Sequence, residues 1–80
     1  MAFYIELEKI EHTNEYVRYK FYTEPDNVGI VEYNFVADLC VEVQHAPSDL
    51  SGCLYERAAL KIVKHWYYDK EFPDKTCWAS

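Results

Sequence analysis

The sequence is poor in the residues that mark flexible, secreted or membrane-spanning proteins. Its 80 residues include only two glycines and three prolines, too few for a disordered or low-complexity chain. The three cysteines, Cys40, Cys53 and Cys77, are an odd number without C-x-x-C spacing, which predicts reduced thiols rather than a disulfide framework. No apolar run has the length of a signal peptide or a transmembrane helix. We therefore expect a cytoplasmic protein of bacterial type that does not bind membranes.

Signals for catalysis and cofactor binding are also scarce. Gly29 and Gly52 are isolated, so the sequence contains no glycine-rich loop that could hold a phosphate. Cys40, His45 and Cys53 could be imagined as zinc ligands, but no pair has the short spacing typical of such a site. Cys53 near a helix N-terminus would have a lowered pKa, yet a chain of this length offers no evident substrate cleft. We expect no enzyme activity, no metal and no cofactor.

The net charge is −6, and it is unevenly distributed. Residues 1–50 contain ten acidic and three basic residues, a balance of −7, whereas residues 51–80 contain four acidic and five basic residues, a balance of +1. A field of negative sign repels phosphates, so we expect no nucleic-acid partner. The same field would attract a basic protein and accelerate the encounter. Solubility alone explains the charge equally well.

Four segments alternate between apolar and polar residues, which is typical of half-buried strands. We place these strands at about residues 2–9, 15–23, 29–37 and 40–45. Short connections between them, including the turn-rich sequence E-P-D-N-V-G at 24–29 and the hairpin connection A-D-L at 37–39, favour an antiparallel meander. The residues predicted to face the core are Phe3, Ile5, Leu7, Val17, Tyr19, Phe21, Val31, Tyr33, Phe35, Val41 and Val43.

From residue 53 the pattern changes to a period of 3.6 residues. It predicts a helix over about residues 53–70 that ends before Phe72-Pro73. One apolar stripe of this helix would cover the sheet, and it consists of Leu54, Tyr55, Ala58, Ala59, Ile62 and Trp66. A second stripe, Leu60, Val63 and Tyr67, is either buried as well or contacts something outside the fold.

The tail, residues 71–80, is expected to fold back onto the domain with Trp78 as an anchor. An apolar sheet face must be covered, and the helix is the segment available to cover it. The predicted fold is therefore a single α+β domain over residues 1–80, an antiparallel four-stranded β-meander with one C-terminal α-helix packed on one face.

The predicted outer face of the sheet carries aromatic rings as well as charges. In E-Y-V-R-Y-K-F-Y-T at 15–23, Tyr16 and Tyr22 lie on the same face as Arg18 and Lys20. Tyrosine and arginine are enriched at protein interfaces, although tyrosine is also a common strand residue. We predict a partner-binding surface with an acidic rim, made of Tyr4, Glu6, Tyr16, Tyr22, Glu24, Asp26, Glu32 and Glu42.

The C-terminal third, E-R-A-A-L-K-I-V-K-H-W-Y-Y-D-K-E-F-P-D-K-T-C-W-A-S at 56–80, follows an acidic predicted meander. Its A-L-K-I-V-K helix, F-P-D-K stop and short aromatic tail resemble the endings of small immunity proteins from bacterial contact-dependent growth inhibition and related polymorphic toxin systems. The resemblance implies a cytoplasmic protein that binds a cognate toxin, often a basic nuclease, and blocks its active site. It carries over no binding residue.

The leading hypothesis is thus an inhibitor, such as an immunity protein, that is steered to a basic toxin and occludes its active site. A related hypothesis is a phage-type acidic inhibitor of a nucleic-acid-binding protein, although Arg18 and Lys20 within the same face argue against pure mimicry of nucleic acid. The alternative is a structural protein. In that case the exposed edge of the first or fourth strand would pair with its twin, giving a homodimer or a larger scaffold.

Overall fold

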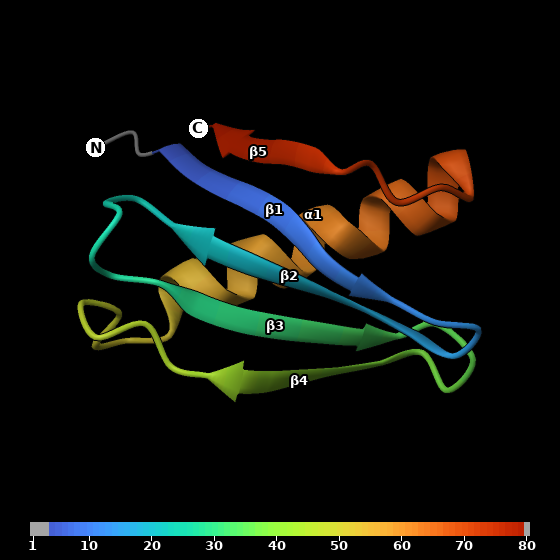
Figure 1. The fold of residues 1–80 in the computed structure, drawn as a ribbon, viewed down its shortest axis with the longest axis horizontal. Coiled ribbons are helices and arrows are strands. Elements are labelled where there is room, and N and C mark those ends of the chain that lie inside the picture. The colour runs from blue at the N-terminus through green and yellow to red at the C-terminus, as the bar shows by residue number, and fades with distance from the viewer. Residues whose placement is uncertain (1–3, 80) are drawn as a thin grey trace.

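The computed structural model describes residues 4–79, which form an antiparallel sheet with a helix across one of its faces (Figure 1). The elements in chain order are β1 (Tyr4–His12), β2 (Tyr16–Tyr22), β3 (Gly29–Asn34), β4 (Leu39–Gln44), α1 (Cys53–Asp69) and β5 (Lys75–Ala79). The order of the strands across the sheet is β4-β3-β2-β1-β5, and each neighbouring pair is antiparallel. The predicted α+β class and the meander of β1 to β4 are confirmed.

The tail adds a fifth strand that the sequence pattern did not predict. β5 pairs with β1, with Trp78 opposite Ile5 and Thr76 opposite Leu7. Trp78 is half-buried against the core, as expected of an anchor. An unpaired strand edge is a ready template for a further strand, and the segment T-C-W-A supplies residues suited to one. As a result the first strand lies inside the sheet. Phe3, predicted to face the core, lies outside the described residues.

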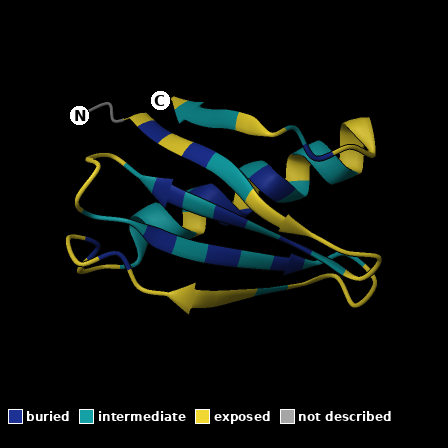
Figure 2. Cartoon of the chain, viewed as in Figure 1, coloured by how far each residue is buried: buried dark blue, intermediate teal, exposed yellow. Residues whose placement is uncertain are grey.

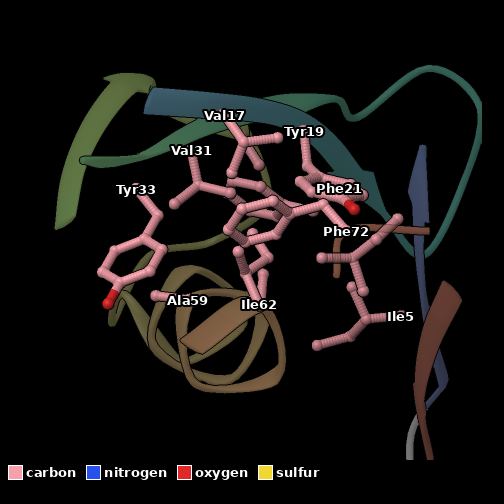
Figure 3. Close-up of a cluster of buried hydrophobic side chains, with 12 residues drawn as sticks. Ile5, Val17, Tyr19, Phe21, Val31, Tyr33, Ala59, Ile62 and Phe72 are labelled. Atoms are coloured by element: carbon pink, nitrogen blue, oxygen red, sulfur yellow. The ribbon is translucent and has the colours of Figure 1, made fainter. Parts of the chain in front are cut away.

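The core lies between α1 and the inner face of β1, β2 and β3 (Figure 3). The alternation is confirmed for β2, for β3 and for β1 as far as Leu7, since the inward positions there are buried and the intervening residues are not (Figure 2). Beyond Leu7 the residues of β1 are half-buried or exposed. The buried strand residues are Ile5, Leu7, Val17, Tyr19, Phe21, Val31 and Tyr33, and Ala58, Ala59 and Ile62 face them from the helix. The two small alanines allow the helix to approach the sheet closely.

The helix has defined signals at both ends. Asp49 is buried, and its carboxylate accepts hydrogen bonds from the backbone N–H groups of Leu54 and Tyr55, both at 3.1 Å. These bonds satisfy two of the amides that a helix N-terminus leaves without intrahelical partners. At the other end Lys70 adopts a left-handed conformation, and its N–H donates to the carbonyl of Trp66 at 3.1 Å. The helix therefore ends just before the predicted stop at Phe72-Pro73.

An aromatic cluster holds the C-terminal end of the helix against the sheet. Phe72 is buried and stacks on Trp66, with ring centroids 5.3 Å apart. Phe35, which lies in the turn after β3, contacts both rings at centroid distances of 4.9 and 5.5 Å. Phe35 thus points to the core as predicted, but from a turn rather than from a strand.

The predicted orientation of β4 is wrong. Cys40 lies opposite the buried Tyr33, and Val41 lies opposite Glu32 on the outer face. Residues directly opposite each other in an antiparallel pair share a face of the sheet. Cys40 therefore faces the helix side, whereas Val41 does not. Val41 and Val43, both predicted to be buried, are 43% and 44% exposed.

The length of the connection before β4 explains this difference. The sequence pattern placed a three-residue connection at 37–39, but β3 ends at Asn34 and the turn occupies the four residues 35–38. The Asn34 side-chain oxygen accepts hydrogen bonds from the N–H groups of Val36 and Ala37 at 3.0 and 2.9 Å, which ends the strand early. A change of register by one residue moves every side chain of a strand to the other face.

Gly29 offers a test of packing between the sheet and its core. It lies opposite Phe21 in the β2–β3 pair, and a methyl group on Gly29 would overlap the Phe21 ring. We expect Gly29→Ala to lower the free energy of unfolding by about 1–3 kcal/mol, because the ring must leave its place in a filled core. Urea denaturation measures this change, with the exposed Thr23→Ala as the control. Equal stability of Gly29→Ala and the wild type would contradict the packing described here.

Candidate functional site

The outer face of β1, β2 and β3 carries a network of charges that compensate one another. The Arg18 guanidinium lies 2.9 Å from Glu32 on β3 and 3.3 Å from Glu11 on β1. Lys20 lies 3.8 Å from Glu8. Hydrogen bonding to Glu32 raises the pKa of Arg18, which keeps this side chain cationic. Glu8 on β1 and Lys20 on β2 lie directly opposite each other, so this ion pair links the two strands.

The two tyrosines that motivated the predicted binding surface belong to this network. Tyr16 donates its hydroxyl hydrogen bond to Glu11 at 3.0 Å, and Tyr22 donates to Glu8. The bond to Glu8 raises the pKa of Tyr22 to about 12. Both rings are half-buried, and the cationic groups of neighbouring side chains lie over them: Arg18 is 5.0 Å from the Tyr16 centroid. The polar ends of these tyrosines are therefore engaged within the sheet.

The predicted binding residues do not form one surface. Tyr4, Glu6, Tyr16, Tyr22 and Glu32 share the outer face of β1, β2 and β3. Glu24 and Asp26 lie in the connection between β2 and β3. The predicted outward placement of Glu42 is wrong, because Glu42 lies opposite the buried Val31 and so faces the helix side. The cause is the four-residue turn that sets the register of β4.

The structure reveals a segregation of charge that the division at residue 50 obscured. Residues 21–56 contain seven acidic residues and no lysine or arginine, a balance of −7. The rest of the chain contains seven acidic and eight basic residues, a balance of +1, so this segment accounts for the whole net charge of −6. Its acidic residues, which we call the acidic set, are Glu24, Asp26, Glu32, Asp38, Glu42, Asp49 and Glu56.

The acidic segment, residues 21–56, lies on one side of the molecule, which we call the acidic side. It comprises the end of β2, all of β3 and β4, their connections, and the start of α1 (green to yellow in Figure 1). The lysines and arginines belong to β1, to the earlier part of β2, to the rest of α1 and to the C-terminal segment with β5. The sheet thus has an acidic edge at β4 and a more basic edge at β5, where Lys75 begins the strand.

β4 is also the most exposed strand of the sheet. It lies at the end of the strand order, so the described part of the chain places no strand on its far side. Leu39, Val41 and Val43 are 58%, 43% and 44% exposed (yellow along β4 in Figure 2). The sequence L-C-V-E-V-Q contains no lysine, arginine or proline, so its protection against pairing is limited to Glu42, which faces the helix side, and to the register shift beyond Glu42. The backbone of Leu39–Gln44 pairs with β3 on one side only, and we call this strand with its open side the β4 edge.

Asp38 ties the turn before β4 to the helix. Its carboxylate accepts a hydrogen bond from the Tyr33 hydroxyl at 2.6 Å, and from the Tyr67 hydroxyl at 2.9 and 3.0 Å. These bonds hold the pKa of Asp38 below its usual value. Tyr67, which belongs to the predicted second helix stripe, therefore contacts the fold through its hydroxyl while its side chain stays largely exposed. The contact fixes the end of the hairpin that carries the β4 edge.

The residues considered for chemistry are not assembled into a reactive site. Among residues 4–79, no three His, Cys, Asp or Glu side chains lie close enough together to hold a metal ion, so Cys40, His45 and Cys53 do not form one. The described cysteines are free thiols, and burial raises the pKa of Cys40. The described part of the chain also shows no pocket. Within it, no helix is both long enough and apolar enough to cross a membrane.

Comparison with protein-family models, with curated proteins and with solved structures finds nothing that matches this chain. The resemblance of residues 56–80 to immunity proteins therefore stays a prediction. The observations that bear on function are the segregated charge and the open, apolar β4 edge.

The Asp38 contacts predict a specific dependence of stability on pH. Because the pKa of Asp38 is lower in the folded state, its contribution is complete above the unfolded-state pKa of about 4 and is lost as the pH falls through the folded-state pKa. We expect Tyr67→Phe to lower the urea midpoint at pH 7 and to reduce the difference between the midpoints at pH 7 and pH 3. Tyr68→Phe, at an exposed neighbouring position, is the matched control. An unchanged pH difference in Tyr67→Phe would show that the bond to Asp38 adds no stability.

Proposed function

We propose that the protein is an inhibitor that binds a basic protein in the bacterial cytoplasm, most specifically an immunity protein that blocks the active site of a basic, nuclease-type toxin. The observation that carries the proposal is the segregation of charge. Residues 21–56 have a balance of −7, and although Glu32 is paired with Arg18 and Asp49 is buried, the remaining acids leave this side of the domain with a net negative charge. Solubility requires net charge but not its concentration on one side, so a cationic partner accounts for the distribution better.

The proposed mechanism of binding depends on the electrostatic field that the acidic side extends into the solvent. Unbalanced charge on one side orients a partner of opposite charge before contact and increases the rate of association. The apolar residues of the β4 edge lie within the same side, so contact there would bury them. Steering followed by apolar burial would place the domain over a basic, anion-binding site of the partner. A site covered in this way cannot admit a nucleic acid or another anionic substrate.

In this proposal the tyrosines of the outer face contribute less to partner binding than the sequence analysis predicted. Tyr16 and Tyr22 have their hydroxyl groups bonded to Glu11 and Glu8, and the nearby charges are paired. Tyr4 is 54% exposed at the start of β1. We therefore assign the outer face a secondary role, as the flank of the interface, and assign the primary role to the acidic side.

A structural protein that associates with itself is the second candidate, and the open β4 edge favours it. Pairing through the first strand, one form of this hypothesis, is excluded because β5 covers that strand. Self-association of β4 with β4 would bring two acidic sides together. Repulsion between like charges opposes such a contact at low salt, which makes a basic partner the better candidate.

The test begins with recovery of the partner from the native cytoplasm by the tagged protein at low and high salt. We expect a basic protein in equimolar amount that is lost at high salt because screening weakens the steering field. The Glu24→Gln/Asp26→Asn double variant should reduce the association rate by roughly threefold to tenfold. Glu15→Gln/Glu71→Gln removes the same charge from exposed positions outside the acidic segment and should leave the rate nearly unchanged.

The recovered partner must then be purified and its activity measured with and without the protein. Inhibition that is complete at one equivalent supports the proposal, and nuclease activity in the partner would make the protein an immunity protein. An equal loss of binding in both double variants would mean that only total charge matters and would contradict the role of the acidic side. Recovery of the protein alone as a salt-resistant oligomer would support the structural alternative.

A further inference from the structure

We propose that the β4 edge accepts an extended segment of the basic partner as an additional strand of the sheet. This inference rests on the proposed function for the charge of the partner, but it adds the binding site and the mode of recognition. The occupant is a short segment that alternates between apolar and basic residues. Three features of β4 carry the inference: its open backbone, the distribution of its side chains and its charged surroundings.

The open backbone provides the directional part of the interaction. β4 is hydrogen-bonded to β3 on one side, and the described chain places no neighbour on the other. Alternate residues of such an edge present their N–H and C=O groups outward, and an added strand pairs with them. α1 crosses behind β1, β2 and β3 and leaves β4 uncovered (Figures 1 and 2), so no helix or strand of residues 4–79 blocks the approach.

The length of the regular edge limits the segment that can bind. The register between β3 and β4 shifts between Val31, which lies opposite Glu42, and Ile30, which lies opposite Gln44. A bulge bends a strand and interrupts regular pairing. The regular part of the edge is therefore Leu39–Glu42, and an added strand would be short and would lie beside Val41.

The side chains of the edge indicate what the segment contains. On the outer face Leu39 and Val41 lie opposite Asn34 and Glu32, and both are largely exposed. An incoming strand with apolar residues on that face would cover them. On the helix side Glu42 lies opposite Val31, 3.3 Å from His45, with a side chain that is 30% exposed. A lysine or arginine on that side of the incoming strand would lie across from this carboxylate.

The charge of the surroundings distinguishes a basic partner from a second copy paired β4 to β4. The edge belongs to the segment that contains the acidic set and no lysine or arginine. A second copy paired through β4 would place two such segments side by side, whereas a basic strand would compensate the charge. Cross-strand pairs of opposite charge stabilise a sheet and pairs of like charge destabilise it. The charges therefore favour the basic partner over a second copy bound through its own β4.

Synthetic peptides of about eight residues test this inference. The probe alternates valine and lysine, the first control alternates glycine and lysine with the same charge, and the second control is the probe with N-methyl groups on alternate amides. Amide chemical shifts of the isotope-labelled protein report where each peptide binds. We expect the probe to shift the amides of Leu39–Gln44 and to slow their hydrogen exchange, and each control to bind at least about tenfold more weakly.

A pair of protein variants completes the experiment. Val41→Lys places a cation on the edge and should weaken binding of the probe by roughly tenfold, since charged residues protect edges from pairing. Leu60→Lys makes the same change at a similarly exposed position on the helix and should leave binding unchanged. Equal effects of the two variants would mean that the added charge acts through the overall field and would overturn the assignment to β4.

The outcomes separate this inference from the proposed function. If the probe and both controls bind equally and salt weakens all of them, steering by the acidic side stands and strand addition is overturned. If no peptide binds at low salt, strand addition is overturned, and the proposed function is then decided by recovery of the partner alone. If the amides of the β4 edge shift with protein concentration alone, a second copy occupies the edge and the basic partner is overturned as its occupant.

Discussion

The turn between β3 and β4 is the constraint on which the surface of this domain depends. The Asn34 side chain ends β3 and holds the first half of the turn, and Asp38 holds its end through the hydroxyl groups of Tyr33 and Tyr67. With four residues in the turn, Tyr33 pairs with Cys40, and the side chains of β4 take their faces from that pair. A turn with one residue fewer would bury Val41 and expose Cys40 instead.

Two properties of the molecule follow from this register. Apolar residues of β4 remain exposed at an edge of the sheet that the helix does not cover, and Glu42 lies on the helix side. The edge also belongs to residues 21–56, the part of the chain with seven acidic residues and no lysine or arginine. Apolar surface and charge of one sign therefore occur together at one border of the domain, where a basic partner would find both.

The sequence predicted the parts of the fold whose periodicity is clear. β2, β3 and the first part of β1 alternate strictly, and the stripe of α1 that contains Ala58, Ala59 and Ile62 has helical spacing, so their buried faces were predicted correctly. β4 has apolar residues at Leu39, Val41 and Val43 with Cys40 between them, so alternation alone supports either face. Asn34 was the sequence signal that distinguishes the two orientations of β4, because its side chain ends β3 at that residue.

The candidate site was less predictable, for physical reasons. The bonds from Tyr16 to Glu11 and from Tyr22 to Glu8 depend on the register between β1 and β2, which includes an irregularity between Lys9 and Glu11. The edge of the fourth strand was one of two open edges predicted from the sequence, and the structure removes the other because β5 covers β1. The absence of lysine and arginine from residues 21–56 was visible in the sequence. Only the fold shows that these residues lie on one side of the domain.

The most direct test of the central claim is a nuclear Overhauser measurement of the register between β3 and β4 in the free protein. The structure predicts cross-strand contacts between the backbones of Tyr33 and Cys40 and between those of Glu32 and Val41. Contacts of Val41 with Phe35 instead would mean a three-residue turn and a buried valine. In that case the apolar edge would not exist, and the charge alone would remain as support for a basic partner.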